Sequence, residues 1–303
     1  MYLIKKYKIN KNVAFESKKL VSFKLVFLIF ILFDISININ KYQYKQDELT
    51  LVSAYYQIKS KHTYSDYFNW ISNIVLLNKS FVFFSNKEFM PLLKQLRPKD
   101  LYYKTVFIEL EINDFYTYRN FYNEFNKTFT IDIENSIHSV PLYLIWGEKS
   151  MFLKKAIKNN YFNSKCFYWI DAGYFQEKNK TDMNRYINNW PSTKKCFEDK
   201  RLLMGQVKNF SDIFKEKIIN FDLVAHKNLQ KDINVIGGLF GGQVDNILKF
   251  IKIYYKTIKV FAKKNLFIGK DQNLYTYIAF SHPELVKLVL FPNNYLYFKV
   301  YLA

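Results

Sequence analysis

Asp171 is the acidic side chain best placed to do chemistry, because it ends an unbroken run of five apolar or aromatic residues. That run, Cys166–Ile170, predicts a buried strand, and Asp171-Ala-Gly173 predicts its end. Ligands of open α/β sheets bind outside the carboxyl ends of the strands. A carboxylate there can hold Mg²⁺ or Mn²⁺ together with phosphate oxygens and water. We therefore expect Asp171 to be a metal ligand; the alternative is an Asp that caps a turn.

A cluster of glycines is the second candidate site. The chain has only eight glycines, and four of them are Gly237, Gly238, Gly241 and Gly242. They lie between an apolar segment at 233–236 and a helical pattern from about residue 244, which predicts a loop. Such a loop lets a ligand approach the backbone, and the helix start behind it offers N–H groups to an anion. The spacing matches neither G-x-x-x-x-G-K-S/T nor G-x-G-x-x-G, and a tight turn is the alternative.

The other polar residues point less clearly to a site. Two acidic pairs with alternate spacing are interpreted as solvent-facing stripes of strands, namely Glu109 with Glu111 and Asp132 with Glu134. The four histidines lack the spacing of metal ligands and are interpreted as structural, namely His62, His138, His226 and His282. Of these, His282 is the best placed for a metal contact. No Ser or Cys nucleophile with a paired His can be read from the sequence.

The elements that must position these residues alternate between strand and helix patterns. Strands are predicted at 51–56, 81–84, 105–110, 166–170 and 233–236. Helices are predicted at 64–77, 88–96, 116–125, 142–156, 244–262 and 271–280. The stretch between residues 174 and 232 is interpreted as largely polar connection, and residues 285–300 as closing structure. This alternation predicts an α/β fold, with a mostly parallel central sheet flanked by helices, in a single domain from residue 46 to residue 303.

The composition limits the classes of protein that fit. Half of the residues are hydrophobic and 19% are aromatic, which excludes an intrinsically disordered chain. The net charge of +19 favours partners that carry phosphate, but the lysines are spread along the chain, so no specific nucleic acid is expected. Cys166 and Cys196 are the only cysteines, which excludes a disulfide framework and leaves a single disulfide open.

Residues 1–45 are predicted to form a basic, partly apolar tail. Seven lysines up to Lys24 precede an apolar run at 25–33 that Asp34 closes, which is the layout of a signal or signal-anchor. As a helix the run extends roughly 14 Å, which is too short to span a bilayer of about 30 Å alone. Two predictions for the tail therefore stay open. It associates with a membrane or directs the protein to the secretory pathway, or it packs on the domain or stays mobile in a cytoplasmic protein.

Several short blocks of the chain carry a resemblance to a known family. They are Leu142-Tyr-Leu-Ile-Trp146 with Lys149, Phe167-Tyr-Trp-Ile-Asp-Ala-Gly173, Thr50-Leu-Val-Ser-Ala-Tyr-Tyr56, and the late glycine cluster with Asp271-Gln272. In these blocks the chain resembles the HtrL/YibB family, whose members are regarded as glycosyltransferases with a GT-A-like fold. The resemblance covers roughly residues 48–290, and the Trp-Ile-Asp-Ala-Gly block is its most specific part.

The resemblance implies a nucleotide-sugar donor, a glycan or glycoconjugate acceptor and a role in glycan synthesis. Many GT-A enzymes carry Asp-x-Asp where this chain has Asp171-Ala-Gly173, so only Asp171 is carried over, as a metal or ribose contact. A divalent cation, Mn²⁺ or Mg²⁺, is the implied cofactor, because it would neutralise the charge that develops on a leaving diphosphate.

Five further residues are given roles under this resemblance. Lys149 lies one helical turn after Trp146 and would meet the diphosphate as a point charge. Trp146 and Trp169 would stack on a base or a sugar. Asp271 and Gln272 begin a helix where acceptor contacts or a catalytic base are expected. The structural alternatives are a solvated lysine, core tryptophans and a plain N-cap.

The resulting hypothesis is a glycosyltransferase that moves a sugar from a nucleotide-sugar donor to a hydroxyl acceptor. Asp171 would lie near the metal, and the 237–242 segment would line the donor or acceptor site. Two other classes of protein stay open: a catalytically silent glycan-binding or scaffold protein of the same fold, and a basic nucleic-acid-binding protein.

Overall fold

The computed structural model describes residues 47–59, 62–177, 180–231, 234–291 and 298–303. The described residues belong to one compact unit. The predicted tail, residues 1–45, lies outside them. Within these ranges, no helix combines the length and the apolar character that crossing a bilayer requires.

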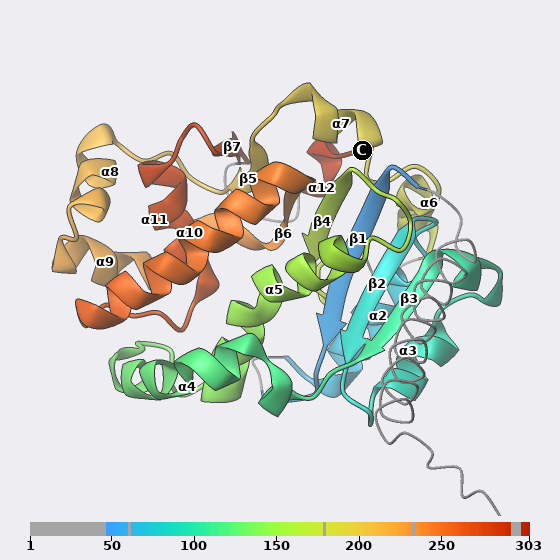
Figure 1. The fold of residues 1–303 in the computed structure, drawn as a ribbon, viewed down its shortest axis with the longest axis horizontal. Coiled ribbons are helices and arrows are strands. Elements are labelled where there is room, and N and C mark those ends of the chain that lie inside the picture. The colour runs from blue at the N-terminus through green and yellow to red at the C-terminus, as the bar shows by residue number, and fades with distance from the viewer. Residues whose placement is uncertain (1–46, 60–61, 178–179, 232–233, 292–297) are drawn as a thin grey trace, which may run out of the picture. The chain divides into compact units, whose positions relative to one another are not determined.

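A seven-stranded sheet with the order β3-β2-β1-β4-β6-β5-β7 forms the centre (Figure 1). The paired strands are parallel except where β6 joins the sheet, because β6 runs antiparallel to both β4 and β5. The strands are β1 Leu49–Tyr55, β2 Ser80–Ser85, β3 Thr105–Glu109, β4 Cys166–Ile170, β5 Leu202–Gln206, β6 Val235–Gln243 and β7 Val286–Leu290. This mostly parallel sheet flanked by helices confirms the α/β class.

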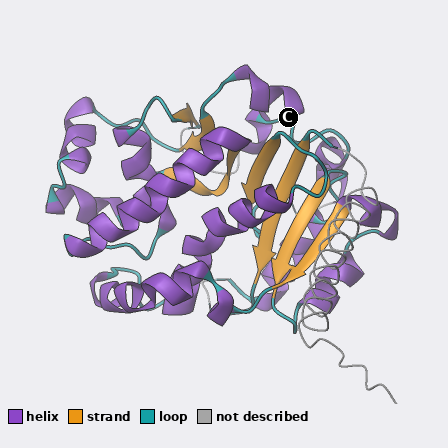
Figure 2. Ribbon diagram, in the orientation of Figure 1, coloured by secondary structure: helices purple, strands orange, loops and turns teal. Residues whose placement is uncertain are grey.

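Helices flank the sheet (Figure 2). They are α2 Tyr64–Ile74, α3 Met90–Leu96, α4 Tyr116–Thr128, α5 Val140–Asn159, α6 Lys180–Ile187, α7 Thr193–Glu198, α8 Asp212–Ile219, α9 Leu223–Leu229, α10 Val244–Lys263, α11 Asp271–Ser281 and α12 Phe298–Tyr301. Short 3-10 helices occupy η1 Lys99–Lys104, η2 Ile112–Asp114 and η3 Phe129–Ile131. In Figure 1, α5 and α10 cross the face of the sheet that is turned toward the viewer.

The central strands are buried on both faces, and their side chains divide by the two-residue period of a strand. β1, β2 and β4 are buried at every position. On one face, Tyr168 joins the apolar core that includes Ile71 and Ile74 of α2. On the other face, Phe152 of α5 stacks on Trp169, with the ring centroids 5.8 Å apart. Helices therefore cover both faces, which explains why β4 is an unbroken run of apolar and aromatic residues.

The predicted glycine loop is wrong, because residues 237–242 lie inside the long strand β6. None of these four glycines has a positive φ, so their backbone conformation does not require glycine. Gly241 is required for close approach, because a Cβ there would overlap the backbone of Phe167 and Tyr168 in β4. The glycines favoured a loop only because strands usually avoid them.

The connection between residues 174 and 232 is also more regular than predicted. It contains the strand β5 and the helices α6 to α9, each of which has eight residues or fewer. A disulfide joins Cys166 in β4 to Cys196 in α7, which resolves the question that the sequence left open. Elements this short show too few periods for a sequence pattern to reveal them.

Glu148 joins α5 to the start of α4. Its fully buried carboxylate accepts hydrogen bonds from the backbone N–H groups of Tyr116 and Thr117, at 3.0 and 2.9 Å. It thereby satisfies two N–H groups that the first turn of α4 leaves without helical partners. Burial raises the pKa of Glu148 to about 7, although these hydrogen bonds oppose the shift.

We expect Glu148→Gln to change how stability depends on pH. The folded-state pKa of Glu148 is raised, so its contribution to the free energy of unfolding is complete below its ordinary value of 4.5 and decreases as pH rises to about 7. The decrease is about 3 kcal/mol at most, since one pKa unit corresponds to about 1.4 kcal/mol. Urea unfolding between pH 4.5 and 7 should show a shallower decrease in Glu148→Gln. The exposed Glu216→Gln is the control, and equal slopes in wild type and Glu148→Gln would contradict the assignment.

Candidate functional site

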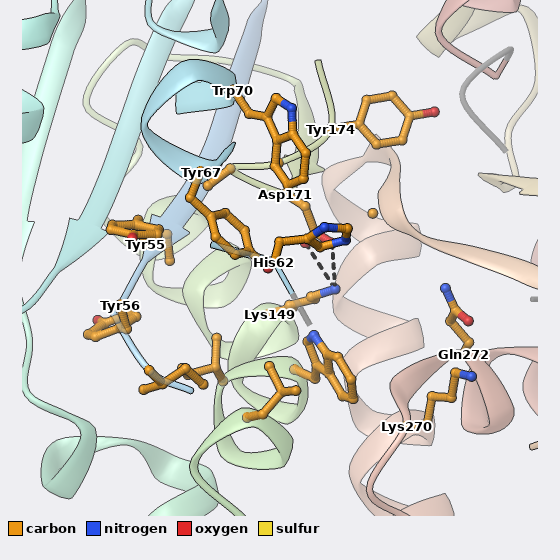
Figure 3. Close-up of a pocket in the computed structure, with 18 of the residues that line it drawn as sticks. Tyr55, Tyr56, His62, Tyr67, Trp70, Lys149, Asp171, Tyr174, Lys270 and Gln272 are labelled. Carbon is orange, nitrogen blue, oxygen red and sulfur yellow. Dashed lines mark hydrogen bonds and ion pairs between the residues drawn. The ribbon is translucent and has the colours of Figure 1, made fainter. Parts of the chain in front are cut away.

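A cleft of about 530 Å³ lies at the carboxyl ends of β1 and β4 (Figure 3). Rings line much of it, from Tyr55, Tyr56, His62, Tyr67, Trp70, His138, Trp146, Trp169 and Tyr174. Charged and amide side chains complete its wall, from Glu134, Lys149, Asp171, Gln176, Lys231, Lys270 and Gln272. Figure 3 shows Lys149 and Asp171 near the middle, with Tyr55 and Tyr56 on one side and Lys270 and Gln272 on the other.

The ammonium group of Lys149 holds two carboxylates together at the floor of the cleft. Its Nζ lies 2.9 Å from Oδ1 of Asp171 and 2.8 Å from Oδ2 of Asp271. It also donates a hydrogen bond to the carbonyl oxygen of Gly237 at 3.1 Å. The contacts with the two carboxylates are ion pairs, and Oδ2 of Asp171 also accepts a hydrogen bond from Nζ at 3.1 Å. We call this arrangement the Lys149 bridge.

Four elements bring the members of the Lys149 bridge together. Lys149 comes from the middle of α5, Asp171 from the end of β4, Gly237 from β6 and Asp271 from the first position of α11. The indole Nε1 of Trp169 donates to Oδ1 of Asp171 at 2.6 Å. Oδ1 of Asp271 accepts the next backbone N–H in α11 at 2.8 Å, which also places a negative charge at the positive end of that helix.

The charges of the bridge depend on one another. Burial opposes the charged form of Lys149, but Asp171 and Asp271 outweigh it, so the pKa of Lys149 is raised. Burial raises the pKa of Asp271, Lys149 opposes this shift, and the nearby Asp171 adds to it. The side chain of Asp171 is 35% exposed, against 4% for Asp271. Asp171 is therefore the carboxylate that a ligand in the cleft can reach.

The donor set around Asp171 does not fit a divalent cation held by the protein. The Lys149 ammonium lies 2.9 and 3.1 Å from the two Asp171 oxygens, on the side where Asp271 would supply a second carboxylate. Across the described ranges, no three or more His, Cys, Asp and Glu side chains gather as metal ligands would. The ammonium group occupies the place between the two carboxylates that a cation would take. We therefore replace the expected metal role of Asp171 with that of a hydrogen-bond acceptor.

Comparison with known proteins places the chain in a family. The model of the family described as "Bacterial protein of unknown function (HtrL_YibB)" matches residues 47–302. The chain belongs to the HtrL_YibB family. Curated proteins give no match to it. The HtrL_YibB match spans the strands, the helices and the residues that line the cleft of the described unit.

The structure brings most of the predicted residues of this HtrL_YibB chain to one place. Those that line the cleft are Trp146, Lys149, Trp169, Asp171, Gly238 and Gln272. Asp271 lies behind Lys149 and is only 3% exposed, so it does not reach a substrate as the expected catalytic base would. Lys149 lines the cleft, but its side chain is 3% exposed and its ammonium group pairs with Asp171 and Asp271; its expected contact with a diphosphate stays a prediction. Gly241 and Gly242 do not reach the cleft, since they pack against β4 and β5.

Gly237 and Gly238 are required by the two carboxylates. A Cβ atom at Gly237 would lie 2.8 Å from Oδ2 of Asp271. A Cβ atom at Gly238 would lie 3.2 Å from Oδ2 of Asp171 and 3.0 Å from the ring of Tyr174. Gly238 lines the cleft and Gly237 adjoins the buried Asp271, so both positions leave space for protein side chains; the predicted ligand contact of these glycines stays a prediction.

Sequence reasoning missed much of the cleft wall. Tyr55 and Tyr56 lie at the end of β1, where the rule that selected Asp171 could have found them. His138 was interpreted as structural and Glu134 as part of a solvent-facing stripe, yet both line the cleft. Glu134 and His138 follow Asp132 closely along the chain, and this cluster of polar residues was the only available sign of a site.

Removing Lys149 should destabilise the fold more than removing an exposed lysine of the same helix. In Lys149→Met the buried Asp271 loses its partner, which costs about 3–5 kcal/mol of the free energy of unfolding at pH 7. The pKa of Asp271 would rise further, so the folded state would bind a proton that the unfolded state lacks, and the loss should shrink from pH 7 to pH 5. Urea unfolding at both pH values measures this.

The exposed Lys154→Met is the matched control, since it lies on α5 away from the cleft. Adding Asp271→Asn to Lys149→Met should recover part of the loss, because the buried charge is then removed. Equal losses for Lys149→Met and Lys154→Met would show that the bridge contributes nothing to stability.

Proposed function

We propose that this HtrL_YibB protein is a glycosyltransferase, which moves a sugar from a nucleotide-sugar donor to a hydroxyl acceptor in glycan synthesis. One observation carries the proposal: Asp171 presents a half-buried carboxylate into a cleft with aromatic walls, at the carboxyl ends of parallel strands. Open α/β sheets bind nucleotides at this edge. In this role the domain is a GT-A-like catalytic domain.

The walls of the cleft match the parts of a nucleotide sugar. Aromatic faces such as those of Tyr67 and Trp70 stack on a base or on the apolar face of a sugar ring. A carboxylate such as Asp171 accepts hydrogen bonds from ribose or sugar hydroxyl groups. Lys231 and Lys270 add positive charge for a diphosphate, in a chain whose net charge is +19. The cleft volume of about 530 Å³ lies within the range of small-molecule sites.

In the proposed reaction, the residues of the cleft mainly hold the donor in position. Asp171 is fixed by Lys149 and Trp169, so it can hold a hydroxyl of the donor without reorganising. Lys270 lies 2.8 Å from Glu134, and together they form a polar wall where charge on the leaving diphosphate is stabilised. Because the donor set does not fit a metal, no step is assigned to one, and release of the diphosphate should continue in a chelator.

A glycan-binding protein without activity is the second candidate. The same aromatic rings and carboxylate would bind a sugar with no reaction following, and the commitment of Lys149 to the bridge favours this alternative. Hydrolysis of the donor separates the two, because a binding protein releases no nucleoside diphosphate.

The proposed activity is tested by release of nucleoside diphosphate from a panel of nucleotide sugars, with Mn²⁺, with Mg²⁺ and with a chelator. We expect the full-length protein to act on one donor, and Asp171→Asn to lower kcat/KM by about 10-fold to 100-fold, the worth of a hydrogen bond to a charged group. Asp114→Asn is the control, because Asp114 forms an exposed ion pair with Arg119 outside the cleft. A folded wild type that acts on no donor would overturn the proposal.

A further inference from the structure

We infer that His138 is the general base that activates the acceptor hydroxyl, with Asp132 as the residue that positions its ring. This inference rests on the proposed glycosyl transfer and supplies the base that Asp271, buried behind Lys149, does not provide. Neither His138 nor Asp132 was given a role from the sequence.

A buried carboxylate fixes one nitrogen of the His138 ring. Nδ1 of His138 lies 2.7 Å from Oδ2 of Asp132, and the Asp132 side chain is 1% exposed. The hydroxyl of Tyr143 donates to the same oxygen. The backbone N–H of Glu134 donates to Oδ1 at 2.9 Å. Asp132 is thus held from three directions, so it places its charge against one edge of the imidazole.

These contacts select the tautomer of the ring. Burial opposes the charged form of Asp132, but the hydrogen bonds from His138, Tyr143 and the Glu134 backbone outweigh it and lower its pKa. An ionised Asp132 accepts a hydrogen bond, so Nδ1 of a neutral His138 must carry the proton. Nε2 then keeps its lone pair, and Nε2 is the ring nitrogen that remains for the cleft that His138 lines. This is the arrangement that a general base requires.

The surroundings of His138 keep the ring in place beside a polar wall. Its ring meets the edge of Trp146, with the centroids 5.1 Å apart and the planes at 87°. The charged groups on this side of the cleft are Glu134, Lys270 and Lys231, and Lys270 is paired with Glu134 at 2.8 Å. His138 and Asp171 line one cleft, so an acceptor hydroxyl can lie between His138 and a donor held by Asp171.

The proposed glycosyl transfer is a single displacement that needs only the donor, the acceptor and His138. As the acceptor oxygen forms its bond to the anomeric carbon, the acceptor O–H bond breaks and its proton moves to Nε2 of His138. The bond between that carbon and the diphosphate oxygen breaks, and its electron pair leaves with the nucleoside diphosphate. The carboxylate of Asp132 stabilises the imidazolium that forms. Such a single displacement inverts the anomeric carbon.

The test uses His138→Asn in the full-length protein. An Asn side chain places an amide N–H near the position of Nδ1–H and keeps the hydrogen bond to Asp132, but it has no group in place of Nε2. We expect kcat for hydrolysis of the donor found in the panel to fall about 100-fold or more, the usual contribution of a general base. The KM for the donor should stay within about threefold, and added imidazole should restore part of the kcat.

Two further variants complete the test. Asp132→Asn should lower kcat with an unchanged donor KM, because it no longer selects the tautomer, whereas a purely structural role would lower thermal stability and affect both constants. His282→Asn is the control, since His282 pairs with Glu284 outside the cleft. Calorimetric titration of the same donor into each variant checks that binding is retained.

The outcomes separate the two proposals. Wild-type hydrolysis with full activity in His138→Asn would overturn the role of His138 and leave the glycosyltransferase proposal standing. A His138→Asn variant that binds the donor but does not turn it over, and that imidazole rescues, would support both. A folded wild type that neither binds nor hydrolyses any nucleotide sugar would overturn both.

Discussion

The contact between the Lys149 ammonium, Asp171 and Asp271 is the interaction on which the rest of the site depends. A buried lysine is stable only with partners of opposite charge, and each carboxylate needs the lysine in return. This mutual requirement ties α5, β4, β6 and α11 to one point. It also explains Gly237, because any side chain there would meet the Asp271 carboxylate. The bridge fixes the positions of both carboxylates, and the partly exposed Asp171 is the one that reaches the cleft.

Aromatic rings and charged groups lie on different parts of the cleft wall. Aromatic faces at the ends of β1 and α2 offer stacking surfaces, whereas the ionic groups gather at the floor and on the opposite wall (Figure 3). The floor contains Lys149 and Asp171, with Asp271 buried behind Lys149, and the wall contains Lys270 with Glu134. A ligand with both an apolar ring and a polar, charged part satisfies this arrangement. A nucleotide sugar, the proposed donor, has these properties, and we propose the His138 and Asp132 pair as the group that activates its acceptor.

The sequence predicted the part of the site that depends on local pattern. Asp171 was found because five apolar or aromatic residues precede it, and Lys149 because it belongs to a block that carries the family resemblance, one helical turn after Trp146. The pairing of Lys149 with Asp271 could not be predicted, because 122 positions separate them and only the packing of α11 against β6 and α5 brings them together. The glycines of β6 were wrongly predicted to form a loop, because glycine usually weakens a strand. In β6 they leave space for a neighbouring strand and for two carboxylates. The histidine at 138 was missed because its partner lies in an irregular segment.

The most direct test of the central claim is a crystal structure of the full-length protein grown with the nucleotide sugar that binds most tightly in calorimetry. We predict the base against the rings of Tyr55, Tyr67 or Trp70, a ribose or sugar hydroxyl on Asp171, and Lys149 still between its two carboxylates. A ligand bound away from this cleft, or bound in it through a metal that has displaced Lys149 from Asp171, would contradict the account.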